Sequence, residues 1–276
     1  MNKTILGKET NYSFHYDSNL LFPIPRKLAR DKMNWSAHLE KNFHGIDIWN
    51  CYEMSWLAQN GLPQVRILRL YIDASSPNIV ESKSLKLYLT SFSNDKFDDQ
   101  ASVLNIIKND LSKLVDTEVK VVLMPLNAVN GDKIHFFKGQ NIDNVVDIEI
   151  KDYNVNKELL SIKSDAIISE ELYSNLLKSN CLVTNQPDWA SIYIKYKGKQ
   201  IDHVGLLKYI ISFRNHNEFH EQCIERIFID IMDKCMPEEL TIYAKYTRRG
   251  GIDINPYRTN IQYSINDIDQ TRDIRQ

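Results

Sequence analysis

The sequence predicts an α+β protein built from two related modules, each an antiparallel sheet with helices on one face. The first observation is an internal repeat, because KLYLTSFSNDKFDDQ at 86–100 resembles KYIISFRNHNEFHEQ at 208–222. Self-similarity at so long a spacing indicates duplicated folding units. The second observation is that strand-like and helix-like patterns follow one another in the same order in both halves. The chain length of 276 residues leaves each module large enough to bury its own core.

The elements of the first half follow from the spacing of apolar residues. Residues 64–71 and 84–89 alternate between apolar and polar, as half-buried strands do. Residues 101–115 have helical spacing, with Val103, Ile107 and Leu111 on one face, and residues 119–124 return to a strand pattern. The following stretch, 127–163, is polar and poorly periodic. We therefore expect the module boundary there, and divide the chain into 1–145 and 146–276.

The second half repeats this order. We expect a strand at 190–196, a helix from about 205, a second helix at about 217–234 and a strand at 240–246. Asn217 is expected to be the N-cap of the second helix. Cys223 and Cys235 fall in the apolar pattern of that helix, so we interpret both as core residues.

Composition excludes several classes of function. A net charge of -2 argues against a general binder of nucleic acid, which would carry a surplus of Lys and Arg. Residues 1–14 contain no apolar signal region, and no apolar run is long enough to span a membrane, so we expect a cytoplasmic protein. The 4 cysteines form no CxxC pair and are expected to be free thiols. Neither GxGxxG nor GxxxxGK[ST] occurs, so any nucleotide is held in another way.

Cys181 and Asp188 form the first candidate for chemistry, in NCLVTNQPDWASI at 180–192. Fully extended, the intervening chain would separate them by about 23 Å, but the Asn-Gln-Pro turn can fold Asp188 back toward the thiol. A cysteine beside an acid suits addition to an electrophile that takes up a proton as it is attacked. The alternatives are that Cys181 is a small buried hydrophobic residue and that Asp188 only caps the turn.

The second candidate is the pair His216 and His220, with Glu221 beside it. The segment reads HNEFH and not HExxH, and Asn217 is expected to interrupt the helix between the histidines, so we do not expect a metal. His220 and Glu221 instead form an adjacent pair at a helix start, suited to proton transfer and to accepting hydrogen bonds from a ligand. A solvated helix end is the alternative.

The last two candidates are found in one half of the chain and not at the matching place in the other. Residues 81–84, ESKS, offer a carboxylate, a hydroxyl and an ammonium just before the strand expected at 84–89. Residues 247–251, TRRGG, combine guanidinium groups with glycines that let a ligand approach the backbone. A simple turn and an exposed hairpin end are the alternatives. Because each half has lost what the other keeps, the pattern indicates one site assembled from both halves.

Together these motifs resemble the NADPH-dependent 7-cyano-7-deazaguanine reductases, the nitrile reductases of queuosine biosynthesis, in their long two-module form. The resemblance is carried by several segments: FHGIDIW at 43–49, ESKSLKLYL at 81–89, LLKSNCLVTNQPDWASI at 176–192, SFRNHNEFHEQC at 212–223 and YTRRGGIDINP at 246–256. It implies tandem tunnelling-fold modules, with ligands bound where modules meet, and a homodimer that takes a small substrate and contacts neither nucleic acid nor membrane directly.

The resemblance also implies roles for individual residues. Cys181 matches the nucleophile that forms a covalent thioimide with the nitrile carbon, Asp188 the proton donor, and His220 a residue that lines the site and helps position substrate and protons. Carboxylates matching Glu81 and Glu221 hold the guanine-like ring, completed by Val80 and Ser82. The positions that match the family's NADPH-binding residues are Ser82, Lys83, Arg249 and Gly250. No metal is implied.

Two other functions remain open from the residues alone. One is a zinc-dependent cyclohydrolase of the same fold that acts on a GTP-like substrate, which would need cysteine and histidine ligands converging on one metal. The other is a non-catalytic purine-binding protein. The activity implied by the resemblance is reduction of 7-cyano-7-deazaguanine to 7-aminomethyl-7-deazaguanine with two NADPH.

Overall fold

The computed structural model describes residues 13–33, 35, 42–128, 134, 136–144 and 148–276. Two compact units are present, and each is assembled from separate stretches of the chain. Unit 1 comprises Met1–Leu28, Ile46–Asp132 and Arg248–Asp253, and unit 2 comprises Ala29–Gly45, Lys133–Thr247 and Ile254–Gln276. The predicted boundary region, 127–163, includes residues outside the described part (129–133, 135 and 145–147). The division at 145/146 stays a prediction.

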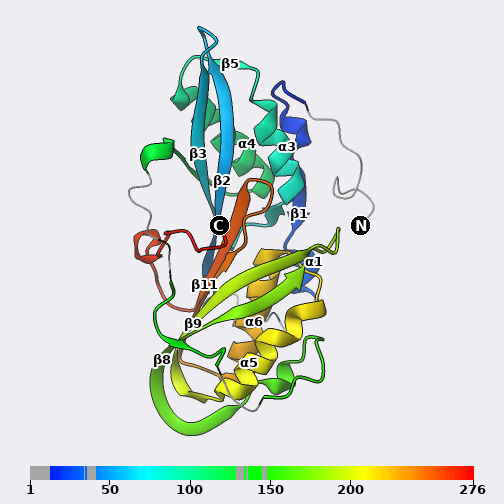
Figure 1. Cartoon of the computed structure of the whole chain (residues 1–276), viewed down its shortest axis with the longest axis vertical. Helices are drawn as coiled ribbons and strands as arrows, with labels where there is room; N and C mark the ends of the chain where they lie inside the picture. Colours follow the sequence, from blue (N-terminus) through cyan, green and yellow to red (C-terminus); the bar gives the residue numbers. More distant parts are fainter. Residues whose placement is uncertain (1–12, 34, 36–41, 129–133, 135, 145–147) are drawn as a thin grey trace. The chain divides into compact units, whose positions relative to one another are not determined.

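Unit 1 contains an antiparallel sheet covered by two helices (Figure 1). The strand order is β6-β3-β2, and β5 pairs in parallel with β2, while β1 and β4 form a separate antiparallel pair. The elements are η1 (Ser18–Leu20), β1 (Pro23–Pro25), α1 (Lys27–Arg30), β2 (His44–Ala58), β3 (Pro63–Asp73), β4 (Asn78–Val80), α3 (Ser82–Ser91), β5 (Lys96–Phe97), α4 (Gln100–Val115), β6 (Lys120–Met124) and η2 (Leu126–Ala128).

Unit 2 has the same plan with longer strands (Figure 1). The strand order is β11-β10-β9-β8-β7, antiparallel except for the short parallel pair β7 and β8. Helix α5 packs against β8, and helix α6 packs against β10. The elements are β7 (Gln140–Asn141), η3 (Lys157–Leu159), β8 (Ile162–Asn180), β9 (Pro187–Ile201), α5 (His203–Ser212), η4 (Phe213–Asn215), α6 (His220–Cys235), β10 (Glu239–Tyr246), β11 (Ile252–Thr259) and η5 (Ile265–Asp267).

The internal repeat is visible in individual hydrogen bonds. Glu81 caps α3 and Asp202 caps α5, each accepting from the backbone N–H of the residue three positions later. In unit 1 the Tyr88 hydroxyl donates to Asp110 over 2.6 Å, and in unit 2 the Tyr209 hydroxyl donates to Asp230 over the same distance. These pairs join the two helices of each unit. The predicted α+β class, with antiparallel sheets and helices on one face, is confirmed.

One predicted element was wrong in type. Residues 84–89 were expected to be a strand, but they belong to helix α3. The spacing of Leu85, Tyr88, Leu89 and Phe92 is helical, and all four are buried. A short apolar run fits both the two-residue period of a strand and the 3.6-residue period of a helix. The N-cap that Glu81 provides favours the helix.

The other predicted elements agree with the structure except at their ends. Helix α6 begins at His220, three residues after the expected start. Strands β2, β8 and β11 were not predicted, and both long strands, β2 and β8, contain register shifts that interrupt simple alternation.

Each unit has a dense apolar core. In unit 1 the inner face of α4 buries Val103, Ile107, Leu111 and Val115 completely. In unit 2 the inner face of α6, including Ile224, Ile227 and Ile231, is completely buried in the same way. Across the described residues, no helix combines the length and the apolar character needed to cross a membrane.

Candidate active site

Cys181 lies at the end of strand β8, at the start of a tight loop that leads into β9. We call residues 181–186 the Cys181 loop. The backbone N–H of Cys181 donates to the Gln186 carbonyl over 2.8 Å, and the Cys181 carbonyl accepts from the Asn185 N–H over 3.0 Å. Asn185 has a φ of 57°, a left-handed conformation that asparagine tolerates. The loop returns the chain so that Asp188 pairs with Ser179 across the hairpin. The turn therefore brings Asp188 back to the strand end that carries Cys181.

A short backbone bridge places the start of α6 beside this hairpin. The Asn180 N–H donates to the His216 carbonyl over 2.8 Å, and the Glu218 N–H donates to the Asn180 carbonyl over 3.1 Å. The prediction that Asn217 caps α6 was wrong, because Phe219 occupies the N-cap position and makes no side-chain cap. The Asn217 amide turns away from the helix and donates to the Cys181 carbonyl over 3.2 Å.

His220, the first residue of α6, faces Asp188. Its Nε2 lies 3.2 Å from Asp188 Oδ2, and Asp188 is only 4% exposed. The imidazole stacks on the Tyr246 ring, with 3.9 Å between ring centroids and 4° between planes. Two neighbours thus fix the position and orientation of the His220 ring.

The two histidines of HNEFH point to different partners. His216 Nε2 lies 2.9 Å from Glu218, whose carboxylate also accepts two hydrogen bonds from Arg226. Burial alone would raise the pKa of Glu218, but these hydrogen bonds outweigh burial and lower it. Within the described ranges, no group of three or more His, Cys, Asp or Glu residues has the arrangement of a metal site.

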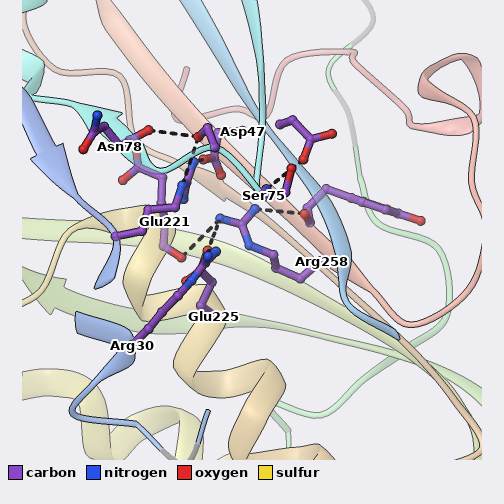
Figure 2. A network of polar contacts seen from close by, with 11 residues as sticks. Arg30, Asp47, Ser75, Asn78, Glu221, Glu225 and Arg258 are labelled. Atoms are coloured by element: carbon purple, nitrogen blue, oxygen red, sulfur yellow. Dashed lines mark hydrogen bonds and ion pairs between the residues drawn. The ribbon is translucent and has the colours of Figure 1, made fainter. Parts of the chain in front are cut away.

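Glu221 lies in the first turn of α6 and is 2% exposed. A buried ion-pair cluster holds this turn (Figure 2). Arg258 Nη2 donates to the Glu221 carbonyl over 3.4 Å and to Glu225 Oε1 over 3.2 Å. Arg30 donates to both Glu225 oxygens, from Nε over 3.1 Å and from Nη2 over 2.9 Å. The Phe43 ring lies 5.5 Å from the Arg30 guanidinium and 5.9 Å from that of Arg258.

The ESKS segment lies at the start of a helix. Glu81 accepts from the backbone N–H of Lys83 over 2.9 Å and of Ser84 over 2.8 Å. Burial raises the pKa of Glu81, and these two hydrogen bonds oppose that shift. Val80 is held by pairing of β4 with β1, opposite Pro23. Ser82 and Lys83 follow as the first residues of α3, where the helix dipole favours anions.

The glycines of the TRRGG segment form a tight turn in unit 1. The Arg249 N–H donates to the Ile252 carbonyl over 2.9 Å, and Gly250 and Gly251 both have left-handed φ angles, 54° and 75°. A Cβ at Gly250 would lie 2.5 Å from the Lys86 ammonium, so this side chain lies directly against the turn. Burial lowers the pKa of Lys86, and the charge of Arg249 lowers it further. An anion here would relieve the repulsion between the two cations.

Comparison with known proteins places the chain in a family. A family profile described as "Nitrile reductase, 7-cyano-7-deazaguanine-reductase N-term" matches residues 12–123, and one described as "QueF-like protein" matches 187–264. An NADPH-dependent 7-cyano-7-deazaguanine reductase from Legionella pneumophila (strain Lens) is 52% identical over 94% of this chain and 90% of its own. One from Burkholderia vietnamiensis is 50% identical over 95% of both. The chain belongs to the NADPH-dependent 7-cyano-7-deazaguanine reductase family.

Similarity to solved structures is much lower. The chain of the crystal structure of the archaeosine synthase QueF-Like in the apo form matches with 14% identity and a TM-score of 0.31, over 37% of this chain and 100% of that one. A likeness this slight carries no argument about the fold.

In this member of the 7-cyano-7-deazaguanine reductase family, the predicted site residues form two sets. Unit 2 holds Cys181, Asp188, His220 and Glu221, and unit 1 holds Val80, Glu81, Ser82, Lys83, Arg249 and Gly250. Sequence reasoning missed Lys86, Asn217 as a partner of Cys181, and Tyr246. Lys86 has a sequence signal, since it follows Lys83 by three positions and a helical period would place both on one side of α3. Contacts of Asn217 and Tyr246 depend on segments distant in sequence.

The thiols of this reductase-family member differ in environment. Cys181 is partly exposed, whereas Cys51, Cys223 and Cys235 are buried, and none of the 4 forms a disulfide. Burial raises the pKa of Cys223 to about 12 and of Cys235 to about 11, and it raises the pKa of Cys51 as well. These buried cysteines stay protonated at neutral pH. The interpretation of Cys223 and Cys235 as core residues is confirmed.

Proposed function

We propose that this protein is an NADPH-dependent reductase that converts the nitrile of 7-cyano-7-deazaguanine to an aminomethyl group, with Cys181 as the nucleophile. The observation that carries the proposal lies at the end of the β8–β9 hairpin. There the partly exposed Cys181 is close in the chain to Asp188, which pairs across the hairpin and contacts His220. The relatives that span 94–95% of the chain have names that state this activity. The pathway is then queuosine biosynthesis.

Cys181 supplies the covalent step. Its thiolate adds to the nitrile carbon, so that a C–S bond forms, one C–N π bond breaks, and the nitrogen takes up a proton to give a thioimide. The sulfur must later leave as a thiolate, because the product carbon carries only hydrogen, nitrogen and ring carbon. The conversion requires two hydrides, and each of two NADPH molecules would supply one of them when bound.

Asp188 and His220 supply the proton. At 3.2 Å the two side chains are close enough to share one proton, held either as the carboxylic acid or as the imidazolium. The pair can release this proton to the nitrile nitrogen as negative charge develops on it, which is typically worth about 10²- to 10⁴-fold in rate. The Tyr246 stack keeps the imidazole in the plane required for this transfer.

Carboxylates bind the ring of the substrate in this proposal. The ring N–H and exocyclic amino group of a guanine-like base are adjacent donors, and an ionised carboxylate accepts from both at once. Glu221 is the residue in unit 2 suited to this contact, since the ion-pair cluster fixes its turn. Glu81, with Val80 and Ser82, is the corresponding candidate in unit 1.

The residues of unit 1 fit the phosphates of NADPH. The absence of a Cβ at Gly250 lets the Lys86 ammonium lie directly against the turn, where the positive charge of Arg249 also acts on it. Ser82 and Lys83 add a hydroxyl, an ammonium and the N-terminus of α3. We assign Ser82, Lys83, Arg249 and Gly250 to the cofactor, with Lys86 added from the structure.

Membership of the reductase family supports further proposals about the substrate, the assembly and the modules. The substrate is a small molecule, and we propose a cytoplasmic homodimer without direct contact to nucleic acid. The modules are proposed to be residues 1–145 and 146–276, each with a tunnelling fold. Light scattering of the purified chain tests the dimer, since a monomer mass would contradict it.

The decisive experiment mixes the protein, the nitrile and NADPH and follows the near-ultraviolet absorbance of the cofactor. We expect two NADPH consumed per nitrile, and a covalent adduct at Cys181 in the intact mass when NADPH is omitted. Cys181→Ala should lose both signals while still binding the nitrile, and Cys235→Ala is the control that keeps both. A protein that binds the nitrile without forming the adduct or oxidising NADPH would instead be a non-catalytic purine binder. Zinc-dependent turnover of GTP would indicate the cyclohydrolase.

A further inference from the structure

We propose that Asn217 is a positioning residue for the nucleophile, because its side-chain amide ties the Cys181 loop to the segment that leads into α6. The inference rests on the proposed role of Cys181. The two N–H bonds of the Asn217 amide go to two points of the loop: the Cys181 carbonyl at 3.2 Å and Asn185 Oδ1 at 2.9 Å. The amide therefore spans the loop from its first residue to the residue that makes its left-handed turn.

These contacts fix the peptide that sets the direction of the Cys181 side chain. The Cys181 carbonyl accepts both from Asn217 and from the Asn185 backbone N–H, so both of its acceptor positions are used. A carbonyl held by two donors cannot rotate without losing one of them. The Cα–Cβ bond of Cys181 adjoins this peptide, so the position of the sulfur depends on it.

Side-chain packing does little to hold the loop. Thr184, Asn185 and Gln186 are exposed, and Leu182 and Val183 are only partly buried. Packing of the loop's own side chains therefore contributes little to its rigidity. The loop's own backbone hydrogen bonds fix its turn, and polar contacts to a fixed neighbour can restrain its position.

The segment around Asn217 is such a fixed neighbour. Its backbone pairs with Asn180 on both sides, through His216 and Glu218. The Glu218 carboxylate is buried and receives two hydrogen bonds from Arg226, which lies two turns into α6. Asn217 thus links the nucleophile to the same helix that carries His220 and Glu221.

The link affects the reaction because the rate of thiolate addition depends on the position of the sulfur. Addition of a thiolate requires sulfur within about 3–3.5 Å of the nitrile carbon, and a misplacement of about 1 Å can cost about 100-fold in rate. Loss of the Asn217 contacts should therefore slow formation of the adduct, with little effect on noncovalent binding of the nitrile.

The test compares Asn217→Asp with Asn217→Ser. In N217D a carboxylate replaces the amide at nearly the same size, but it can only accept, so it cannot bond to the Cys181 carbonyl. The Asn185 amide can turn its Nδ2 toward that carboxylate, so the contact to Cys181 is the one that cannot be restored. N217S is uncharged and too short to span the loop. Asn215→Asp is the matched control, because it makes the same change at an exposed residue of the same segment.

Two quantities are measured on the full chain. The first is the rate of adduct formation with 7-cyano-7-deazaguanine in the absence of NADPH, by rapid quench and intact mass. The second is the affinity for the nitrile, with Cys181→Ala added to each variant so that no adduct can form. We expect N217D and N217S to slow the adduct by about 10- to 100-fold, and the affinity and the N215D rates to stay within about threefold of the parent.

Adduct rates near the parent value in both Asn217 variants would overturn the inference. An equal loss of affinity and of adduct rate would also overturn it, because Asn217 would then shape the substrate pocket and not the nucleophile. If N217D does not fold, N217S alone decides between these outcomes. A parent protein that forms no adduct would refute the proposed function itself, which is a separate result.

Discussion

Replacing Glu225 with glutamine should destabilise unit 2 and loosen the turn that carries Glu221. Glu225 lies between Arg30 and Arg258, and the side chains of Glu225 and Arg258 are 1% and 0% exposed (Figure 2). Removing one partner of a buried ion pair typically costs about 3–5 kcal/mol, because the remaining charge stays desolvated. The glutamine keeps one acceptor oxygen but turns an NH₂ group toward a donor of Arg30. We therefore expect a loss of about 3 kcal/mol, toward the lower end of that range.

This loss can be measured by thermal unfolding. For a chain of this size, 1 kcal/mol corresponds to roughly 2–4 °C in Tm, so E225Q should lower the Tm by roughly 6–12 °C. Glu238→Gln is the matched control, since Glu238 pairs with Lys197 at 3.1 Å and both side chains are about half exposed. Such a surface pair contributes at most about 1 kcal/mol.

The variant should also bind the nitrile more weakly. Arg258 donates to the Glu221 carbonyl as well as to Glu225, so a shift of its guanidinium moves the first turn of α6. Binding is measured by titration with Cys181→Ala present, well below the Tm. If E225Q melts within about 2 °C of the parent, as a surface substitution would, Glu225 does not form a stabilising buried network with Arg30 and Arg258.

Three further predictions concern the site. Glu221→Gln should weaken nitrile binding by about 10-fold or more, since an amide offers one acceptor where two donors need a pair; unchanged affinity in a titration would exclude Glu221 from ring binding. Tyr246→Leu should lower kcat about 10-fold by releasing the His220 ring, whereas Tyr246→Phe keeps the 3.9 Å stack and should retain activity; equal kcat values would contradict this role. Lys86 has a lowered pKa, so it loses its charge as pH rises through a value below 10.5, and NADPH affinity should fall over that interval with uptake of a proton on binding. Lys86→Met should bind NADPH more weakly and flatten this pH profile, which fluorescence titration at several pH values would show.

Several contacts around the candidate site could be predicted because the residues are close in sequence or follow a local rule. The Asn-Gln-Pro turn returns Asp188 to Cys181, and the structure builds this return into a β-hairpin. The apolar pattern of the last helix also identified its buried cysteines. Prediction from local sequence failed at 84–89, where the apolar residues fit the period of a strand and that of a helix equally well. It also failed where a polar side chain had two possible hydrogen-bond partners. Asn217 is a good N-cap by residue type, but the loop of Cys181 competes for its amide.

The sequence by itself determined the duplication, the α+β class and the family, and it supplied the residues that we propose as nucleophile, acid and ring-binding carboxylates, because residue type, periodicity and motif order are encoded locally. Only the tertiary structure decided which groups meet: Tyr246 against His220, Arg258 and Arg30 around Glu225, and Lys86 against the Gly250 turn. These contacts join segments far apart in the chain, and their geometry is set by how helices pack on sheets. A side chain's partner, and with it the pKa and rigidity that the chemistry requires, follows from that packing.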